Sequence, residues 1–398
     1  MNMTTERSRN PYAGIDWEKC FRITGCTHMH CTSAEILQRY LESGLEFATL
    51  SNYYPSTPWY PLAPLRKNFT RIRQTGYVRN GVWRQDELDI NAVIQIWKDK
   101  LPSELQARLP FREGAKLFPE LPPSLLEAPN AEHHWFTDAG IWLHIAAPGC
   151  TLSSGSFDID GKYGLEKYGH IQLGAPVPWR DGFRLLLDSR LYSDGGGIVI
   201  NHPTWSHLPV DFLCELLDFG PGVLGMEIYN HNSRDSFSDF SDSLWDAVLA
   251  TGRQCFGFCV QDHPTVDRKW LGRIVLLPEE RTAESCLKAM RAGRFYGAIA
   301  GNGLQFDYLN FDGKTLRAKC NREAVFQLIA KTGVIGDTVR STEFEFTVPD
   351  SDRGKYVFLR LTASEGREEE KLFAQPFMLD QTENSCVESR EHKGRHVK

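Results

Sequence analysis

Thr27-His28-Met29-His30-Cys31-Thr32 is the stretch on which the predicted fold depends, because it joins a strand predicted over 21–26 to a helix. Side chains alternate along a strand, so His28 and His30 project to one side, where one cation could meet both imidazoles. Thr32-Ser33-Ala34-Glu35 then has the form of a capping box, followed by apolar residues at helical spacing. A His-x-His pair alone is weak evidence for a metal site, so further ligands must be sought downstream.

Length and composition narrow the classes of protein. The chain has 398 residues, of which 41% are hydrophobic and 12% aromatic, which allows two domains and excludes disorder for most of it. The 45 basic and 51 acidic residues give a net charge of -6, which disfavours binding to a nucleic-acid polymer. No apolar run predicts a membrane span or a secretory signal. We expect a cytoplasmic protein with a small-molecule substrate, and the sequence leaves a homo-oligomer open.

Cysteine usage supports this compartment. The ten cysteines are scattered, and several, such as Cys26, Cys255 and Cys259, lie in apolar runs that predict buried strands. Buried free thiols in a reducing compartment account for this pattern better than disulfides do.

The N-terminal part predicts an α/β domain over 16–300, after a flexible leader over 1–15. A second strand over 45–50 follows the first helix, and strand, helix, strand in some thirty residues is typical of a parallel sheet. Periodicity is lost over 55–129, which we interpret as an inserted cap with helices over 87–100 and 103–109.

Downstream, apolar strands alternate with helices. Strands are predicted over 141–145, 198–203, 223–229 and 255–260, and helices over 181–191, 243–250 and 282–293. Polar residues of the kind that bind metals lie at or near the strand ends: His28 and His30, Glu132 with His144 nearby, His202, Glu227 to Asn230, and Asp262 with His263. If the strands close into one barrel, these residues converge at its mouth and form a metal site.

From 301 the hydrophobic period changes to two. Short strands are predicted over 304–311, 316–320, 324–330, 343–348, 356–363 and 372–379, with a hairpin turn at Asp312-Gly313. These predict an all-β Ig-like sandwich over 301–380. The charged tail over 381–398 is expected to be disordered.

The candidate ligands decide the chemistry. Histidine nitrogens combined with carboxylates suit Zn²⁺, Mn²⁺ or Fe²⁺ better than Mg²⁺ or Ca²⁺. Two such ions that share a carboxylate lower the pKa of a bridging water and produce hydroxide at neutral pH, which is most often used for hydrolysis.

At this point the sequence resembles the PHP (polymerase and histidinol phosphatase) family over about 20–300. The resemblance rests on Thr27 to Thr32, His202-Pro203, Met226 to Asn230, Trp245-Asp246 and Asp262-His263. It implies a distorted seven-stranded (β/α) barrel with a metal site, and many members are phosphoesterases. The C-terminal stretch, from Ala292-Gly293-Arg294-Phe295-Tyr296 to Gln375-Pro376, resembles the accessory β-domain of two-domain members.

The resemblance also implies a ligand set. One ion position would be held by His28, His30, Glu132 and Asp262, and Glu132 would bridge to a second held by His144 and His202. His133 and His134 are neighbours that leave an alternative to this assignment open.

Three departures from the family pattern concern its third ion. Ser51-Asn52-Tyr53 replaces the usual Thr-Asp-His, and the histidine usual shortly after the His-x-His is absent. Asp262 and His263 are adjacent instead of forming Asp-x-His, so on a strand they would point opposite ways. We therefore expect two divalent transition-metal ions, with Asp262 and His263 as catalytic residues and His263 in a supporting or substrate-contacting position.

Substrate contacts are less defined. Tyr229, Asn230, Arg253 and His207 are candidates. The leading hypothesis is a metal-dependent phosphoesterase that uses a metal-bridging hydroxide on a small phosphorylated metabolite or nucleotide. The alternatives are a two-metal hydrolase of an amide or lactone, and a catalytically degenerate barrel that binds a ligand.

Overall fold

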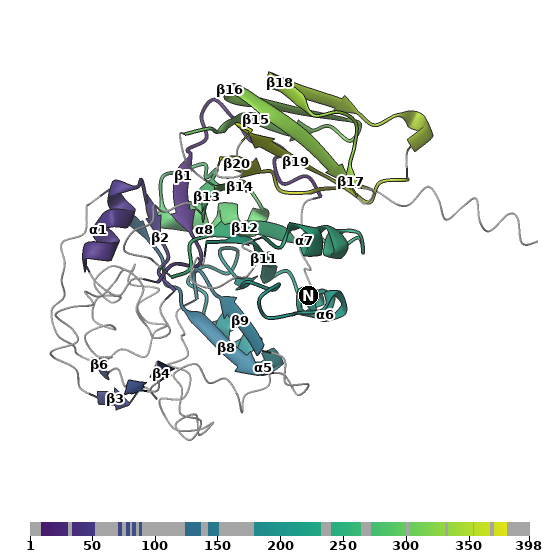
Figure 1. The fold of residues 1–398 in the computed structure, drawn as a ribbon. Helices are drawn as coiled ribbons and strands as arrows, with labels where there is room; N and C mark the ends of the chain where they lie inside the picture. Colours follow the sequence, from purple (N-terminus) through teal and green to yellow (C-terminus); the bar gives the residue numbers. More distant parts are fainter. Residues whose placement is uncertain are drawn as a thin grey trace, which may run out of the picture.

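The computed structural model describes most of the two predicted domains and little of the insertion. The described residues are 9–30, 34–51, 71–73, 77–79, 82–84, 87–89, 124–136, 142–150, 179–231, 240–263, 272–299, 303–330, 333–352, 354–366 and 370–379. They form a mixed α/β structure whose strands lie mainly in two large sheets (Figure 1).

The His-x-His stretch follows the first strand of the larger sheet. β1 (Ile23–Cys26), α1 (Ala34–Glu42) and β2 (Phe47–Ala48) form the predicted strand, helix, strand unit. β1 and β2 are parallel, with Gly25 opposite Phe47, which confirms the predicted parallel pairing. β7 (Leu126–Glu127) continues the parallel arrangement beyond β2.

Two strands extend this sheet on the other side of β1. β13 (Gly272–Leu276) pairs antiparallel with β1, and β14 (Phe295–Ile299) pairs antiparallel with β13. The sequence did not predict β13, whose residues alternate between buried and intermediate positions.

The second sheet carries the other predicted ligands. Its order is β12 (Phe256–Val260), β11 (Val223–Asn230), β10 (Ile198–Ile200), β9 (Trp142–Ala146) and β8 (Glu132–Phe136). β10, β11 and β12 are parallel, whereas β8 and β9 form an antiparallel hairpin. All eight residues of β11 are buried, as is typical of a strand covered on both faces.

Among the described residues, four helices follow the insertion: α5 (Trp179–Asp188), α6 (Val210–Asp218), α7 (Asp242–Leu249) and α8 (Ala283–Ala292). α8 begins where predicted because the Thr282 side chain accepts the Ser285 N–H, and it ends at Gly293 in the left-handed conformation with φ 74°. α6, which the sequence did not predict, lies beside α7 (Figure 1). No helix in the described ranges is long and apolar enough to span a membrane.

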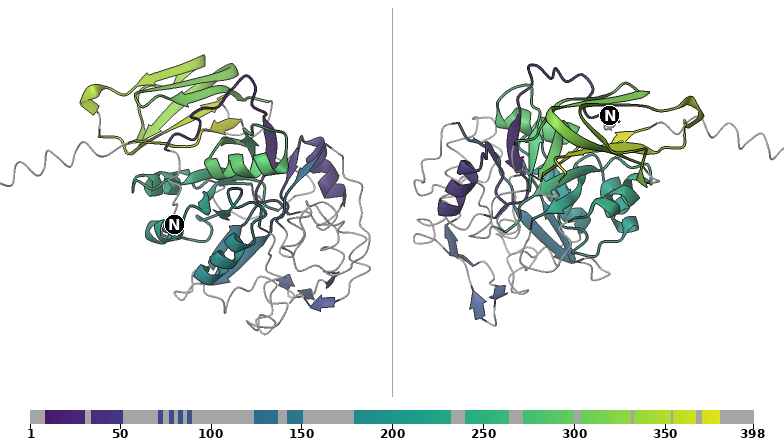
Figure 2. Two further views of the ribbon diagram at one scale, coloured as in Figure 1. Left: turned by 180° about the vertical axis from the view of Figure 1, so that it is seen from behind. Right: turned by 45° about the horizontal axis from the view of Figure 1, so that its top comes forward.

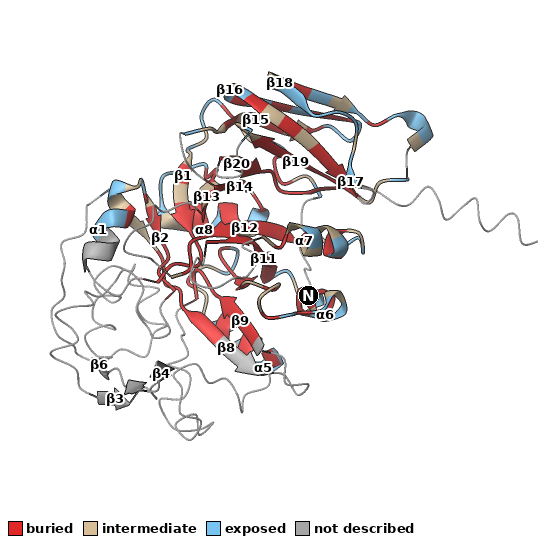
Figure 3. Cartoon of the chain, in the orientation of Figure 1, coloured by how far each residue is buried: buried red, intermediate tan, exposed pale blue. Residues whose placement is uncertain are grey.

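The strands of both sheets form the core, and the helices expose their outer faces (Figure 3). Met29, Ala48 and Phe258 belong to one buried cluster, which links the strands on either side of the predicted site. The described cysteines are free thiols, and all but Cys20 are buried, which agrees with the expectation.

The C-terminal strands are gathered at one end of the molecule (Figures 1 and 2). They are β15 (Phe306–Phe311), β16 (Thr315–Ala330), β17 (Gly333–Val334), β18 (Val339–Thr347), β19 (Phe358–Ser364), β20 (Lys371–Phe373) and β21 (Phe377–Met378), with a 3-10 turn, η3 (Asp350–Asp352). The predicted hairpin is confirmed: Asp312 Oδ1 accepts the Thr315 N–H at 2.7 Å. The strands predicted over 316–320 and 324–330 are one strand, β16.

Strand pairing joins the two predicted domains. β20 pairs with β14, so one ladder runs β15-β16-β19-β20-β14-β13-β1-β2-β7. The described strands outside the insertion thus lie in a continuous sheet and a second, five-stranded sheet. A closed barrel and an Ig-like sandwich therefore remain predictions.

Two sequence-based expectations need correction. Within the flexible leader predicted over 1–15, the described residues 9–15 contain a packed side chain, because Tyr12 is buried and its hydroxyl donates to the Phe295 carbonyl at 2.8 Å. The helix predicted over 87–100 begins instead with β6 (Glu87–Asp89), which pairs with β3 (Arg71–Arg73). Another short pair, β4 (Tyr77–Arg79) with β5 (Val82–Arg84), lies in the insertion. Residues 90–109 and the tail over 381–398 lie outside the described ranges.

Candidate metal centre

Backbone hydrogen bonds tie the His-x-His stretch to the residues after β12. The Asp262 N–H donates to the His28 carbonyl at 2.8 Å, and the His30 N–H donates to the Asp262 carbonyl at 3.0 Å. The Met29 N–H donates to Ser51 Oγ at 2.9 Å. Ser51 therefore joins two strand ends, and Asn52 and Tyr53 lie outside the described residues.

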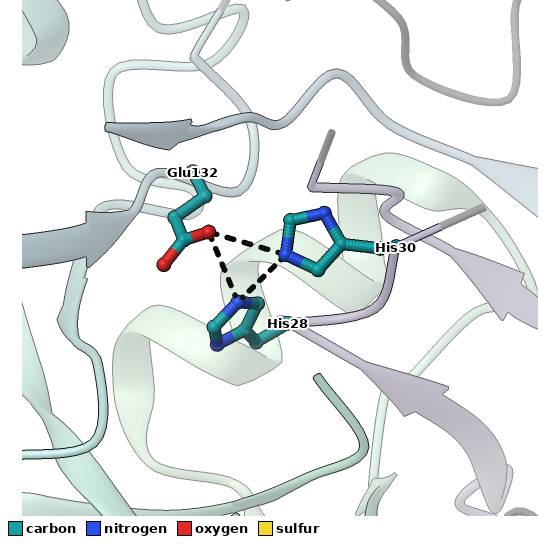
Figure 4. A group of neighbouring side chains, drawn as sticks. All are labelled: His28, His30 and Glu132. Atoms are coloured by element: carbon teal, nitrogen blue, oxygen red, sulfur yellow. Dashed lines mark hydrogen bonds and ion pairs between the residues drawn. The ribbon is translucent and has the colours of Figure 1, made fainter. Parts of the chain in front are cut away.

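Four buried donor atoms from three parts of the chain meet at this point, and we call them the first cluster: His28 Nε2, His30 Nε2, Glu132 Oε2 and Asp262 Oδ1. His28 Nε2 lies 3.2 Å from His30 Nε2, 3.5 Å from Glu132 Oε2 and 3.2 Å from Asp262 Oδ1. His30 Nε2 lies 3.1 Å from the glutamate oxygen and 3.5 Å from the aspartate oxygen. Figure 4 shows the two imidazoles and the glutamate converging.

These separations fit a tetrahedral ion. Ligand atoms about 2.0 Å from a Zn²⁺ ion at the centre of a tetrahedron are about 3.3 Å apart. The two imidazole nitrogens match this spacing, because they lie 3.2 Å from each other and 3.1 to 3.5 Å from each of the two carboxylate oxygens. The two imidazoles are therefore spaced to share one transition-metal ion with either carboxylate.

Glu132 also belongs to a second cluster. Its other oxygen, Oε1, lies 3.2 Å from His144 Nδ1 and 3.4 Å from His202 Nε2. Ligand atoms of Glu132, His144 and His202 all lie within 4.8 Å of one another, close enough for a shared ion. The two oxygens of one carboxylate thus face different histidine groups, which is the arrangement of a bridging ligand.

The second cluster is built differently from the prediction. Glu132 begins β8 and His144 lies within β9, where Glu132 is paired with Ala146. His144 lies within a strand that is antiparallel to both its neighbours, so the expectation of a ligand at a parallel strand end is wrong for it, whereas Glu132 follows the parallel strand β7. The hairpin places them instead, helped by Asn130, which donates to the Thr27 and Thr49 carbonyls and accepts the Ala147 N–H.

Two predicted ligands have a left-handed backbone. The φ angles of His202 and Asp262 are 24° and 59°. Residues other than glycine rarely adopt this left-handed region, and those that do are often found at functional sites. At Asp262 this conformation breaks the strand alternation. His263 therefore does not point away as predicted: its ring stacks on His30 at 4.0 Å, and Nε2 lies 3.8 Å from Asp262 Oδ1.

His30, Asp262 and His263 form a further group whose ligand atoms lie within 4.8 Å of one another. It shares two residues with the first cluster. The expectation of two ions rested partly on a His263 side chain that points away from Asp262. Because His263 instead lies beside Asp262 and His30, that part of the reason for expecting two ions is lost.

Electrostatics favour a cation here. Burial alone lowers the pKa of His28, but the carboxylates of Asp262, Glu132 and Glu227 raise that pKa well above its usual value. Burial likewise lowers the pKa of His202, and its contact with Glu132 is the main cause of the net increase. Burial raises the pKa of Asp262, yet the nearby imidazoles of His28, His263 and His30 lower it overall. The carboxylates therefore stabilise positive charge, whether on a proton or on a metal ion.

Two of the four predicted substrate contacts lie away from the clusters. Arg253 lies before β12, at the opposite end from Asp262, and both Nε and Nη2 donate to Asp218 at 2.8 Å. It therefore does not join the clusters. His207 is exposed, and no contact within the described ranges brings it to them.

The other two candidates lie on β11. Tyr229 is buried, with its hydroxyl 2.8 Å from His231 Nδ1. Asn230 donates to Asp262 Oδ2 at 3.1 Å, so it contacts a predicted ligand directly. Substrate binding by either residue stays a prediction.

Two residues that contact the clusters were not among the predicted ligands, although the sequence placed Glu227 among the polar residues at strand ends. Asn201 is buried and donates to Glu132 Oε1 at 3.3 Å. Glu227 is buried and lies 2.7 Å from His28 Nδ1. Both residues could have been identified in the sequence, because each is a polar residue at or near the end of an apolar strand and close in sequence to another candidate residue.

No model of a known protein family matches the sequence, and no curated protein matches it. Among solved structures, it is similar to the crystal structure of a two-domain protein containing a predicted PHP-like metal-dependent phosphoesterase from Bacteroides vulgatus ATCC 8482. The TM-score is 0.41 and the identity 11%, over 94% of this chain and 99% of that chain. At these values the likeness assigns neither a family nor an activity to this protein.

Proposed function

We propose that the protein is a metal-dependent hydrolase with two transition-metal ions, and specifically a phosphoesterase of small phosphorylated metabolites or nucleotides. The observation that carries the proposal is the division of Glu132 between the clusters, with Oε2 3.1 Å from His30 Nε2 and Oε1 3.2 Å from His144 Nδ1. A buried carboxylate that faces histidines on both sides is suited to hold two ions a few ångströms apart.

The residues fit such ions. His28 and His30 would hold one with Glu132 and Asp262, whose oxygens lie beside them, and Glu132, His144 and His202 would hold the other. This set of nitrogen and carboxylate donors suits Zn²⁺, Mn²⁺ or Fe²⁺. When bound, two such ions lower the pKa of a shared water and polarise a phosphoryl oxygen.

His263 is the proposed substrate-contacting residue beside the ligands. Its side chain is 41% exposed, whereas those of His28 and Asp262 are 0% and 4% exposed. It stacks on His30 and lies close to Asp262, so it is both beside the ligands and open to a substrate. Burial and the neighbouring His30 imidazole lower the pKa of His263 to about 4, so at neutral pH its ring is uncharged and can accept a hydrogen bond or a proton from a bound substrate.

Hydrolysis of an amide or lactone by the same centre is the second candidate. It uses the same ligand set, because a metal-bound hydroxide does not itself determine which bond it attacks.

The first experiment measures metal content. Protein purified without chelator is expected to contain about two transition-metal ions per chain. His202→Ala should lose the ion of the second cluster, and the exposed Glu279→Gln, whose side chain is 80% exposed, should keep both as a matched control. A wild-type chain that neither contains nor takes up Zn²⁺ or Mn²⁺ would contradict the proposal.

The second experiment identifies the bond cleaved. Phosphomonoesters, phosphodiesters, amides and lactones are supplied to the metal-loaded protein and to a His28→Ala variant. Turnover of a phosphate ester that the variant loses supports the phosphoesterase. Turnover restricted to an amide or lactone supports the second candidate, and no turnover of any class would favour a ligand-binding protein.

A further inference from the structure

Glu227, on β11, lies behind the predicted ligands and is only 1% exposed. Its carboxylate lies within hydrogen-bond distance of three N–H groups. Oε1 is 2.7 Å from His28 Nδ1, and Oε2 accepts the His202 backbone N–H at 2.6 Å and the Asn230 Nδ2–H at 2.8 Å. Such charge-assisted hydrogen bonds are stronger than those between neutral groups.

The contact with His28 determines which imidazole nitrogen faces the first cluster. A carboxylate only accepts hydrogen bonds, so His28 Nδ1 must be the donor. In the neutral ring, Nε2 then carries a lone pair, and this is the atom 3.2 Å from Asp262 Oδ1. A histidine that gives its other N–H to a carboxylate is held in the tautomer and orientation needed for metal binding.

The contact with His202 acts on the second cluster. His202 has φ 24°, and a left-handed backbone at such a residue is maintained only when its surroundings hold it. Glu227 Oε2 accepts the N–H of this residue, which keeps the turn that brings His202 Nε2 to 3.4 Å from Glu132 Oε1.

We infer that Glu227 is the positioning residue for both ion positions, an inference that rests on the proposed function. It is not part of any group within the described ranges whose atoms are spaced to share an ion. Its two oxygens instead set the ring of His28 in the first cluster and the backbone of His202 in the second. One substitution at Glu227 should therefore weaken the binding of both ions, although Glu227 is a predicted ligand of neither ion.

The test is metal binding by Glu227→Gln, with Thr49→Val as the control. Glutamine keeps the size but has one acceptor oxygen, so it cannot accept from all three N–H groups. Thr49 is buried beside the same strand ends, and its Oγ1 donates to the Cys26 carbonyl at 2.5 Å. The control thus loses a buried hydrogen bond without contact to a predicted ligand.

Zn²⁺ affinity is measured by competition with a chelator, and Co²⁺ is used to record the visible spectrum of the site. We expect Glu227→Gln to bind both ions about 10- to 100-fold more weakly, the usual effect of losing a partner of a metal ligand, with an altered Co²⁺ spectrum. Thr49→Val should match the wild type. Affinity and spectrum unchanged in Glu227→Gln, or equal losses in both variants, would overturn the inference.

A second measurement uses the wild-type chain, in case Glu227→Gln does not fold. Long-range ¹H–¹⁵N spectra of the Zn²⁺-loaded protein should show His28 protonated at Nδ1, and a proton at Nε2 would overturn the inference. A wild type that binds ions while Glu227→Gln is unaffected refutes only the role of Glu227. A wild type that binds no ion refutes the proposed function, and the inference with it.

Discussion

At the scale of single residues, Glu132 differs from the other predicted ligands because its two oxygens have different neighbours. Oε2 faces His28 and His30, and Oε1 faces His144 and His202. The histidines each belong to one side only in these contacts. Substitutions at Glu132 and at a terminal histidine should therefore have different consequences.

Glu132→Gln is expected to reduce the content of both ions, because it removes the negative charge and one acceptor oxygen from the bridge. His144→Ala should reduce only the ion of the second cluster. Elemental analysis of the two variants beside the wild type measures this. Loss of one ion in Glu132→Gln and of both in His144→Ala would contradict a bridging role.

The pKa of His28 predicts a pH dependence. Because it is raised above the ordinary value of 6.5, metal-free protein holds the His28 proton to higher pH than a free imidazole does, and an ion must displace this proton. Metal affinity should therefore rise with pH, and calorimetry in buffers of different ionisation enthalpy should show proton release. The stability that this proton gives the metal-free protein is complete below pH 6.5 and is lost as pH rises through the raised pKa. Affinity that is independent of pH would contradict this account.

At the scale of elements, close packing of β11 against β12 positions two of the strand ends. Gly225 lies opposite Phe256, and a Cβ at Gly225 would come 2.0 Å from the Phe256 carbonyl oxygen. Only glycine fits there, because the obstacle is backbone and cannot rotate away. The register of Glu227 and Asp262 relative to each other depends on this approach.

Gly225→Ala should lower the free energy of unfolding by about 3 kcal/mol or more, through strain in the packed sheet. Gly44→Ala is the control, since Gly44 has φ 94° but open space around its Cβ position. Its cost should be about 1 kcal/mol, from the left-handed backbone alone. Denaturant unfolding compares the two, and similar losses would show that the close approach is relieved at little cost.

At the scale of the whole molecule, the C-terminal strands complete the sheet that carries the His-x-His stretch. β20 pairs with β14, and the Gln375 side chain donates to the Gly257 carbonyl and accepts its N–H. Arg360, on β19, is 3% exposed and is paired with Asp246 of α7. Gly257 is in β12, so the C-terminal part supports the strand that leads to Asp262.

A chain that ends at residue 300 should therefore fail to fold cooperatively. It would expose the edge of β14 and the buried Tyr296 side chain. The backbone N–H and carbonyl of Gly257 would lose the Gln375 side chain, and each of these two groups costs about 1–3 kcal/mol if it stays buried without a partner. Circular dichroism and thermal unfolding of this chain and the full-length protein test the prediction. A truncated chain with a single sharp transition and intact metal uptake would show that the first part is an independent domain.

The sequence by itself determined the local elements and most of the candidate ligands. Hydrophobic period, the cap at Thr282 and the turn at Asp312-Gly313 predicted elements that the structure contains, because these signals act between residues near in sequence. Histidine and carboxylate chemistry identified His28, His30, Glu132, His144, His202 and Asp262, which lie in the clusters.

Only the tertiary structure decided how these parts meet. The hairpin that presents Glu132 and His144, the left-handed backbone that turns His263 toward His30, and the partners of Glu227 depend on contacts between distant segments. The continuous ladder through β20 and β14 and the burial of Tyr12 depend on them too. Such contacts form because each strand or side chain needs a partner to cover its apolar face and to pair its buried polar groups, and local sequence does not say which partner that is.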